Sequence, residues 1–180
     1  MNQTRTPHQL YLEGQSAYRA KSFTSAAQYF VAAEIGYRAA GNELLAAEMA
    51  NNASVAHLQA GDAQSAFLAV VGTEAIFTTA GDQHKAAMAL GNQGAALEDL
   101  GDLELAAQNY TQSAELLKEL GEHDLRASVL QSLSALQLRT GRSLQALATM
   151  QAGVDNLEKP NLKQRLLKRL LKVPFRLLNR

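Results

Sequence analysis

Residues 91–113 read GNQGAALEDLGDLELAAQNYTQS, and this stretch decides the fold. Gly101 interrupts it, and a glycine followed by an aspartate is typical of a helix end followed by a new helix start. Beyond the glycine, apolar residues recur at steps of three and four, as in Leu103, Ala107 and Tyr110. The stretch therefore predicts two helices joined by a short turn.

The same pattern recurs every 40 residues, a period typical of stacked structural repeats. The columns are Ala26, Ala66, Ala106 and Ala146; the bulky Phe30, Val70, Tyr110 and Met150; the small Ala33, Thr73, Ser113 and Gly153; the small Gly14, Ser54, Gly94 and Ser134; and the breaks at Gly41, Gly81 and Gly121 and at Gly61, Gly101 and Gly141. Small columns predict close approach of the two helices of a pair, and the bulky column fills the gap between them.

These columns predict four helix pairs, at about 8–41, 42–81, 82–121 and 122–160, after a flexible N-terminus at 1–7. In the second unit the helices are expected at roughly 43–60 and 62–80. Lys21 replaces the mid-unit glycine of the first unit. Aspartates after the breaks, such as Asp62 and Asp82, are expected to accept hydrogen bonds from the first N–H groups of the next helix.

Residues 91–103, with Ala106, Tyr110 and Ser113, resemble the tetratricopeptide repeat signature of small, large and aromatic residues. The usual period of that family is about 34 residues, and the longer period here is similar to the long-helix variety of kinesin light chains and spindle-orientation adaptors. The resemblance covers about 8–160. It implies an all-α fold, a right-handed α-solenoid of four antiparallel helix pairs, and binding of another protein through a peptide or helix.

The resemblance also implies a concave groove lined by the first helix of each pair. In the family, an asparagine two residues before the small column contacts the backbone of a bound peptide, and Asn52 and Asn92 match that position. An amide suits this role because it both donates and accepts hydrogen bonds. The alternative is that both amides bond to neighbouring helix backbone and organise packing.

The candidate groove residues are Tyr11, Gln15, Tyr18, Asn52, Asn92 and Glu98. Neighbouring positions carry Glu48, Asn51, Gln59 and Asp99, so the groove is expected to be polar to acidic. Such a groove favours a basic or amphipathic partner segment. Since Arg19 and Arg139 are the only cations at matching positions, we expect no recognition of an acidic chaperone tail.

The C-terminal segment differs from the repeats in charge. Residues 1–158 hold 17 acidic and 9 basic residues, whereas residues 159–180 hold 8 basic residues and no acidic one. Residues 161–178 alternate leucines and cations as a basic amphipathic helix does, with a kink expected near Pro174. The candidate contact residues of this tail are Lys163, Arg165, Lys168, Arg169, Lys172, Phe175 and Arg176.

Three roles fit the tail. It can cap the open end of the solenoid, contact an anionic membrane surface, or bind a partner or the acidic body of another copy. A nucleic-acid role is not expected, because the cations are confined to one helix beside an acidic body and no recognition motif accompanies them.

The sequence offers no chemistry for catalysis. It contains no cysteine, its four histidines lack metal-ligand spacing, and it has no phosphate-binding loop and no apolar run that spans a membrane. We therefore expect no enzyme, no metal and no cofactor, but a cytoplasmic adaptor or assembly factor, peripheral at a membrane if the tail binds lipid. The alternatives are a self-assembling structural protein and a peptide-sensing regulatory module.

Overall fold

The computed structural model describes residues 5–155, 157 and 165, and the regular structure in this part of the chain is helical throughout. The helices are α1 (Pro7–Arg19), α2 (Phe23–Ala39), α3 (Glu43–Gln59), α4 (Ala63–Val70), α5 (Thr73–Thr79), α6 (Gln83–Leu100), α7 (Leu103–Glu119), α8 (His123–Arg139) and α9 (Ser143–Asp155). The predicted all-α class is confirmed.

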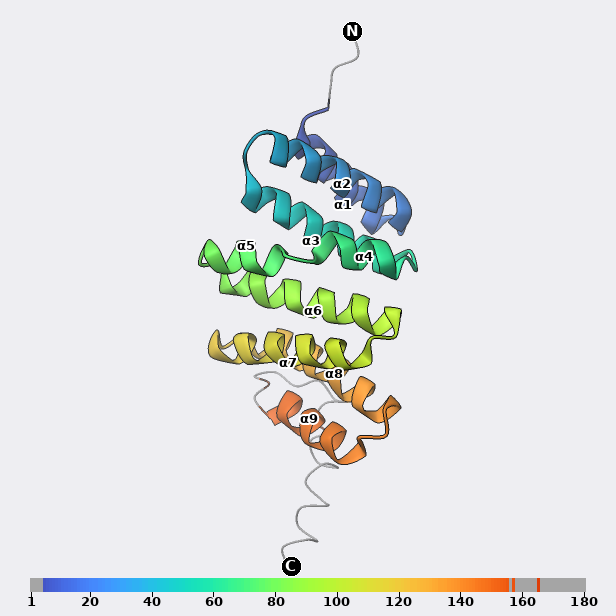
Figure 1. The fold of residues 1–180 in the computed structure, drawn as a ribbon, viewed down its shortest axis with the longest axis vertical. Coiled ribbons are helices and arrows are strands. Elements are labelled where there is room, and N and C mark those ends of the chain that lie inside the picture. Colours follow the sequence, from blue (N-terminus) through green and yellow to red (C-terminus); the bar gives the residue numbers. More distant parts are fainter. Residues whose placement is uncertain (1–4, 156, 158–164, 166–180) are drawn as a thin grey trace, which may run out of the picture. The chain divides into compact units, whose positions relative to one another are not determined.

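The chain forms two compact units, Met1–Ala106 and Ala107–Arg180. In the first, α1 packs on α2, α2 on α3, α3 on α4, and α6 on both α4 and α5 (Figure 1). In the second, α8 packs on α9. Within the first unit α1 to α4 thus pack in chain order and α5 packs on α6, and in the second unit α8 packs on α9, which is consistent with the predicted helical-repeat solenoid. The right-handed sense of the solenoid stays a prediction.

The turns between helices form where the glycine columns predicted them. The backbone of all six glycines has positive φ, between 73° and 87°: Gly41, Gly61, Gly81, Gly101, Gly121 and Gly141. Asp62 and Asp82 cap the helices that follow, each accepting a 3.0 Å hydrogen bond from the backbone N–H three residues on. These hydrogen bonds from the backbone are the main reason why the pKa of both carboxyls is lowered. In the first unit Lys21 adopts the same left-handed conformation, with φ 59°.

The predicted continuous helix at 62–80 is wrong, because the backbone breaks at Val71 and Gly72. Val71 is extended, with ψ 128°, and Gly72 has φ 84°, a conformation that glycine adopts at low cost. The Thr73 hydroxyl closes the break by donating to the Val70 carbonyl at 2.7 Å. Val70 and Phe77 are fully buried on either side, so packing holds the two short helices in place.

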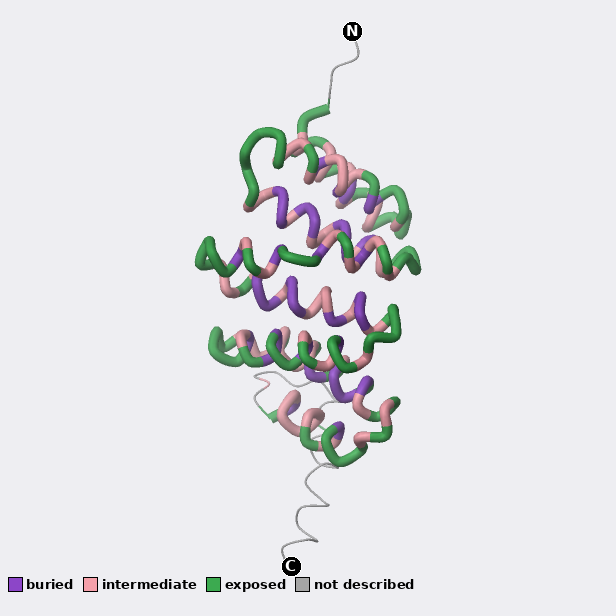
Figure 2. Tube along the Cα trace, in the orientation of Figure 1, coloured by how far each residue is buried: buried purple, intermediate pink, exposed green. Residues whose placement is uncertain are grey.

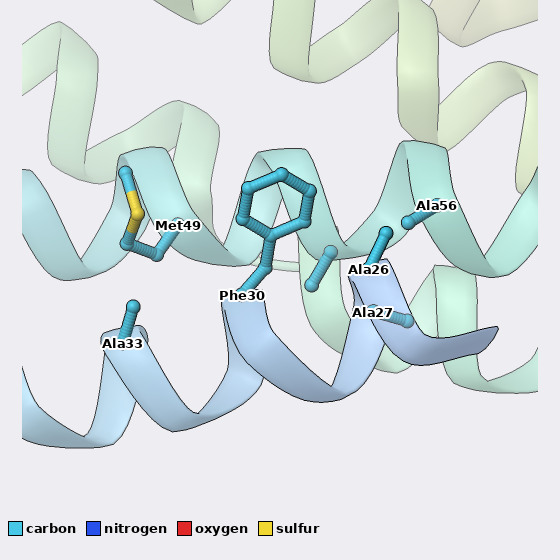
Figure 3. Close-up of a cluster of buried hydrophobic side chains, with 7 residues drawn as sticks. Ala26, Ala27, Phe30, Ala33, Met49 and Ala56 are labelled. Atoms are coloured by element: carbon cyan, nitrogen blue, oxygen red, sulfur yellow. The ribbon is translucent and has the colours of Figure 1, made fainter. Parts of the chain in front are cut away.

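The core of the first unit is built mainly from alanines, and buried residues run along the length of α3 and α6 (Figure 2). Phe30 reaches from α2 towards α3 and lies near Met49, Ala26 and Ala56 (Figure 3). A Cβ atom added to Gly14 of α1 would lie 2.7 Å from the Phe30 ring. The small and bulky columns therefore meet in this helix pair, as predicted.

Candidate functional site

A pocket of about 290 Å³ lies in the first unit, between α1 and α3 with α2 behind them. Its lining residues are Gln15, Tyr18, Arg19, Phe30, Asn52 and Val55. The pocket thus brings together three of the candidate groove residues that the sequence predicted, namely Gln15, Tyr18 and Asn52.

Helix geometry explains why these side chains gather. Gln15 and Tyr18 are three residues apart on α1, and Asn52 and Val55 are three apart on α3, so each pair shares one helix face. Position 14 carries no side chain, and the Phe30 ring, 4% exposed, fills the space against it. The Tyr18 ring lies edge-on to Phe23, with 5.3 Å between ring centroids.

The two candidate asparagines have different surroundings. The Asn92 side chain donates a 2.8 Å hydrogen bond to Oδ1 of Asn51, which ties α6 to α3. Asn52 is half-buried and faces the pocket, and its amide makes no hydrogen bond within the described residues. An amide in this position has both its donor and its acceptor available to a ligand.

Tyr11 lies beside the pocket residues rather than among them. Gln15 donates a hydrogen bond from Nε2 to the Tyr11 hydroxyl. The Tyr11 ring is tilted against Phe30, with 6.3 Å between ring centroids. Tyr11 therefore orients Gln15 and packs against the same phenylalanine that closes the pocket.

Glu48, one acid of the groove that the sequence predicted, lies in an ion pair, and the acidic character of the groove stays a prediction. Lys85 of α6 donates to Glu48 of α3 at 2.6 Å and lies 3.0 Å from Asp82. The hydrogen bond to Glu48 is the main cause that raises the pKa of Lys85. One acid of the expected acidic surface is thus neutralised, and the charged residue at the pocket is the cation Arg19.

The other candidate residues lie elsewhere. Glu98 is half-buried near the C-terminal end of α6 and does not line the pocket. In the tail, Lys163, Lys168, Arg169, Lys172, Phe175 and Arg176 lie outside the described residues. Arg165 is helical and exposed.

The sequence did not single out Phe30 or Val55 as site residues. Phe30 was expected only in packing, and Val55 carries no recognisable signal beyond its place three residues after Asn52. The sequence did not indicate that Lys85 pairs with Glu48, because the two residues lie on different helices, 37 positions apart.

Two further findings bear on chemistry. Within residues 5–155, 157 and 165, no group of three or more potential ligands is arranged to hold a metal ion. In the same part of the chain, every helix is too short or too polar to cross a bilayer.

Residues 85–159 match the family model described as tetratricopeptide repeat. The matched segment begins in α6 and extends past the end of α9. A comparison with curated proteins gave no match.

Proposed function

Since the chain is a tetratricopeptide repeat protein, we propose that it is a non-enzymatic, cytoplasmic adaptor that binds an extended peptide segment of another protein against α1 and α3. Repeats of this family generally mediate contacts between proteins. The observation that carries the proposal is the half-buried Asn52 amide, which faces a pocket and has no partner among the described residues.

Asn52 supplies the contact to the peptide backbone. Its side chain can accept from one backbone N–H and donate to one backbone C=O of an extended segment. This contact is independent of the peptide's sequence. A hydrogen bond of this kind contributes about 0.5–1.5 kcal/mol net, so Asn52 positions the segment while other contacts supply most of the affinity.

The pocket supplies those other contacts. Its walls are the rings of Tyr18 and Phe30 and the methyl groups of Val55, and its volume is about 290 Å³. A large apolar side chain of the partner fits such walls, and fully burying one contributes about 1.5–3 kcal/mol. The polar Gln15 and Arg19 at the margin favour a segment in which this side chain is flanked by polar residues.

Peptides selected from a random library on the full-length protein test the proposal. Asn52→Ala should weaken the selected peptides by roughly 2- to 10-fold, and Val55→Asp should weaken them further because it places a charge in the apolar wall. Gln64→Ala removes an amide from an exposed position of α4 and is the matched control, with no effect expected. If Asn52→Ala and Val55→Asp both leave affinity unchanged, the peptide does not bind at this pocket.

For the tail we keep the roles that the sequence left open, and a chain that ends at Glu158 separates them. Loss of thermal stability in the shortened chain supports a cap. Loss of flotation with anionic liposomes supports a membrane contact. Salt-sensitive oligomers in light scattering that vanish with the tail support the alternative of self-assembly.

A further inference from the structure

A cavity of about 440 Å³ lies in the second unit along one face of α8, with α7 and α9 on its sides. Four residues of α8 line it at steps of four, three and four, and so form one stripe along the helix: Arg126, Leu130, Leu133 and Gln137. The flanking helices contribute mostly small residues, which leave the space open: Thr111 and Ala114 of α7, and Ala148, Thr149 and Ala152 of α9. This cavity, the α8 trough, has a volume within the roughly 300–1,000 Å³ that is typical of small-molecule sites.

Both cations of the α8 trough lie at one end of it. Lys118 is near the C-terminus of α7 and Arg126 is in the first turn of α8, so they flank the turn that joins these two helices. Arg126 Nη1 donates to the Ala152 carbonyl of α9 at 3.1 Å. The Nε atom of Arg126 is buried and has no hydrogen-bond partner in the described part of the chain. No carboxylate within the described residues forms an ion pair with this guanidinium.

The free edge of the guanidinium suits a carboxylate. With Nη1 bonded to Ala152, Nε and Nη2 point the same way, and two parallel N–H groups bind the two oxygens of a carboxylate in a bidentate pair. A buried donor without a partner costs free energy, which a ligand recovers by bonding to it. The acid Glu115 also lines the trough, about one turn before Lys118 on α7, so two cations and one acid leave one net positive charge in the lining.

The middle of the α8 trough is apolar, and its far end carries an acceptor. Leu130 and Leu133, which are 7% and 4% exposed, form the floor. Beyond them, Oε1 of Gln137 is buried and has no hydrogen-bond partner among the described residues. From Arg126 to Gln137 the helix rises about 16 Å. A ligand that satisfies both ends has a carboxylate, an apolar body, and a hydrogen-bond donor at its other end.

The span between the two polar ends sets the length of the ligand. Hydrogen bonds of about 3 Å at both ends take up about 6 Å of this span and leave about 10 Å. Each bond of an extended carbon chain advances about 1.3 Å, because a C–C bond is about 1.5 Å long and the angle is near 111°. About eight bonds therefore connect the two terminal oxygens, which corresponds to about seven or eight carbons.

We propose that the α8 trough binds a linear carboxylic acid of about eight carbons with a hydroxyl group at its far end. The carboxylate pairs with Arg126, the hydrocarbon chain lies on Leu130 and Leu133, and the hydroxyl donates to Oε1 of Gln137. The trough shares no lining residue with the Asn52 pocket, so this proposal and the proposed function are tested separately.

Three other occupants fit less well. A simple fatty acid places a methyl group against Gln137 and leaves the buried acceptor without a donor. A peptide of the same length carries backbone N–H and C=O groups that the leucine floor cannot bond, and burying them costs free energy. The segment 159–180 of this chain carries 8 basic residues and no acidic one, so it does not complement a lining with net positive charge.

Nitrogen-15 NMR of the full-length protein tests the proposal, because Arg126 Nε–H gives its own signal, assigned by its loss in Arg126→Lys. The probe is 8-hydroxyoctanoate, compared with octanoate, with 1,8-octanediol and with the tripeptide acetyl-Ala-Leu-Ala as its free acid. We expect 8-hydroxyoctanoate to move the Nε–H signal saturably below about 5 mM. Octanoate should bind roughly 2- to 10-fold more weakly because it lacks the hydroxyl group, and the diol at least about 10-fold more weakly because the charged pair is lost.

Two variants and a control locate the contacts, followed on the methyl signals of Leu130 and Leu133. In Gln137→Met, similar in shape but without a polar oxygen, the advantage of 8-hydroxyoctanoate over octanoate should vanish. Arg126→Lys keeps the charge but removes the two-pronged edge, so it should weaken both acids about 10-fold. Arg38→Lys changes an arginine of α2 that pairs with Glu34 and is the matched control, with no effect expected.

Several results would overturn the proposal. They are an unmoved Nε–H signal, octanoate or the diol binding as tightly as 8-hydroxyoctanoate, and the tripeptide binding more tightly than it. An advantage of 8-hydroxyoctanoate over octanoate that persists in Gln137→Met would likewise exclude the assigned hydroxyl contact.

Discussion

The contact between Gly14 and Phe30 gives the sharpest test of how the repeat columns build a helix pair. In Gly14→Ala the new Cβ would lie 2.7 Å from one ring carbon of Phe30, against at least 3.4 Å for an ordinary contact, so the ring must retreat by roughly 0.7 Å. The ring is 4% exposed and packs in the α2–α3 cluster, so this retreat disturbs its packed neighbours.

The magnitude follows from two opposing effects. Overpacking a core of this kind costs about 1–3 kcal/mol, and replacing a mid-helix glycine by alanine contributes about 1 kcal/mol of helix propensity. Gly14→Ala should therefore lower the free energy of unfolding by about 1 kcal/mol. In a Phe30→Leu background the ring edge is gone. Gly14→Ala should then raise the free energy of unfolding by about 1 kcal/mol.

The assay is a double-mutant cycle in urea, followed by circular dichroism. Phe30→Leu alone should cost about 1–2 kcal/mol, and the coupling between the two changes should be about 1–3 kcal/mol. Gly153→Ala is the matched control, since its Cβ would meet its nearest neighbour at an ordinary 3.4 Å. If Gly14→Ala is equally stabilising with and without the Phe30 ring, the close packing of the two columns is refuted.

Three further changes test the turns and caps. Lys21→Gly should stabilise the protein by up to about 1 kcal/mol in urea unfolding, because φ 59° strains a lysine and not a glycine; destabilisation would contradict a left-handed turn there. Gly72→Ala should cost about 1 kcal/mol, because φ is 84°; a gain of similar size would indicate that the helix continues through Gly72. The pKa of Asp82 is lowered in the folded state, so its charge stabilises the fold above the unfolded value of 3.8, and that contribution is lost as pH falls through the folded pKa. The wild type should therefore exceed Asp82→Asn in unfolding free energy at neutral pH and lose this advantage as the pH falls below 3.8; an advantage independent of pH would exclude the carboxylate as its source.

The features that the sequence predicted correctly are those that depend on local chemistry. Glycine at Gly101 permits a left-handed turn that few residues adopt, so the turn could be predicted without knowing the packing. The break at Gly72 was missed because apolar residues at helical spacing continue through it. Only the fully buried Val70 and Phe77 show that packing holds two short helices there.

The sequence predicted which site residues share a helix face, but not which residues of different helices contact each other. Residues on one helix, such as Gln15 and Tyr18, can be assigned to one face from their spacing alone. Contacts between helices depend on how the helices are offset and rotated against each other, which the sequence alone does not determine. It therefore could not show that Asn92 bonds to Asn51, or that Lys85 neutralises Glu48, while Asn52 faces a pocket.

The measurement that tests the central claim most directly is an NMR structure determination of contacts between the full-length protein and a library-selected peptide. We expect intermolecular nuclear Overhauser effects from an apolar side chain of the peptide to the Val55 methyl groups and the Tyr18 ring, with the Asn52 side-chain amide shifted on binding. Contacts confined to exposed residues away from α1 and α3, such as Leu68 or Leu144, would contradict the account.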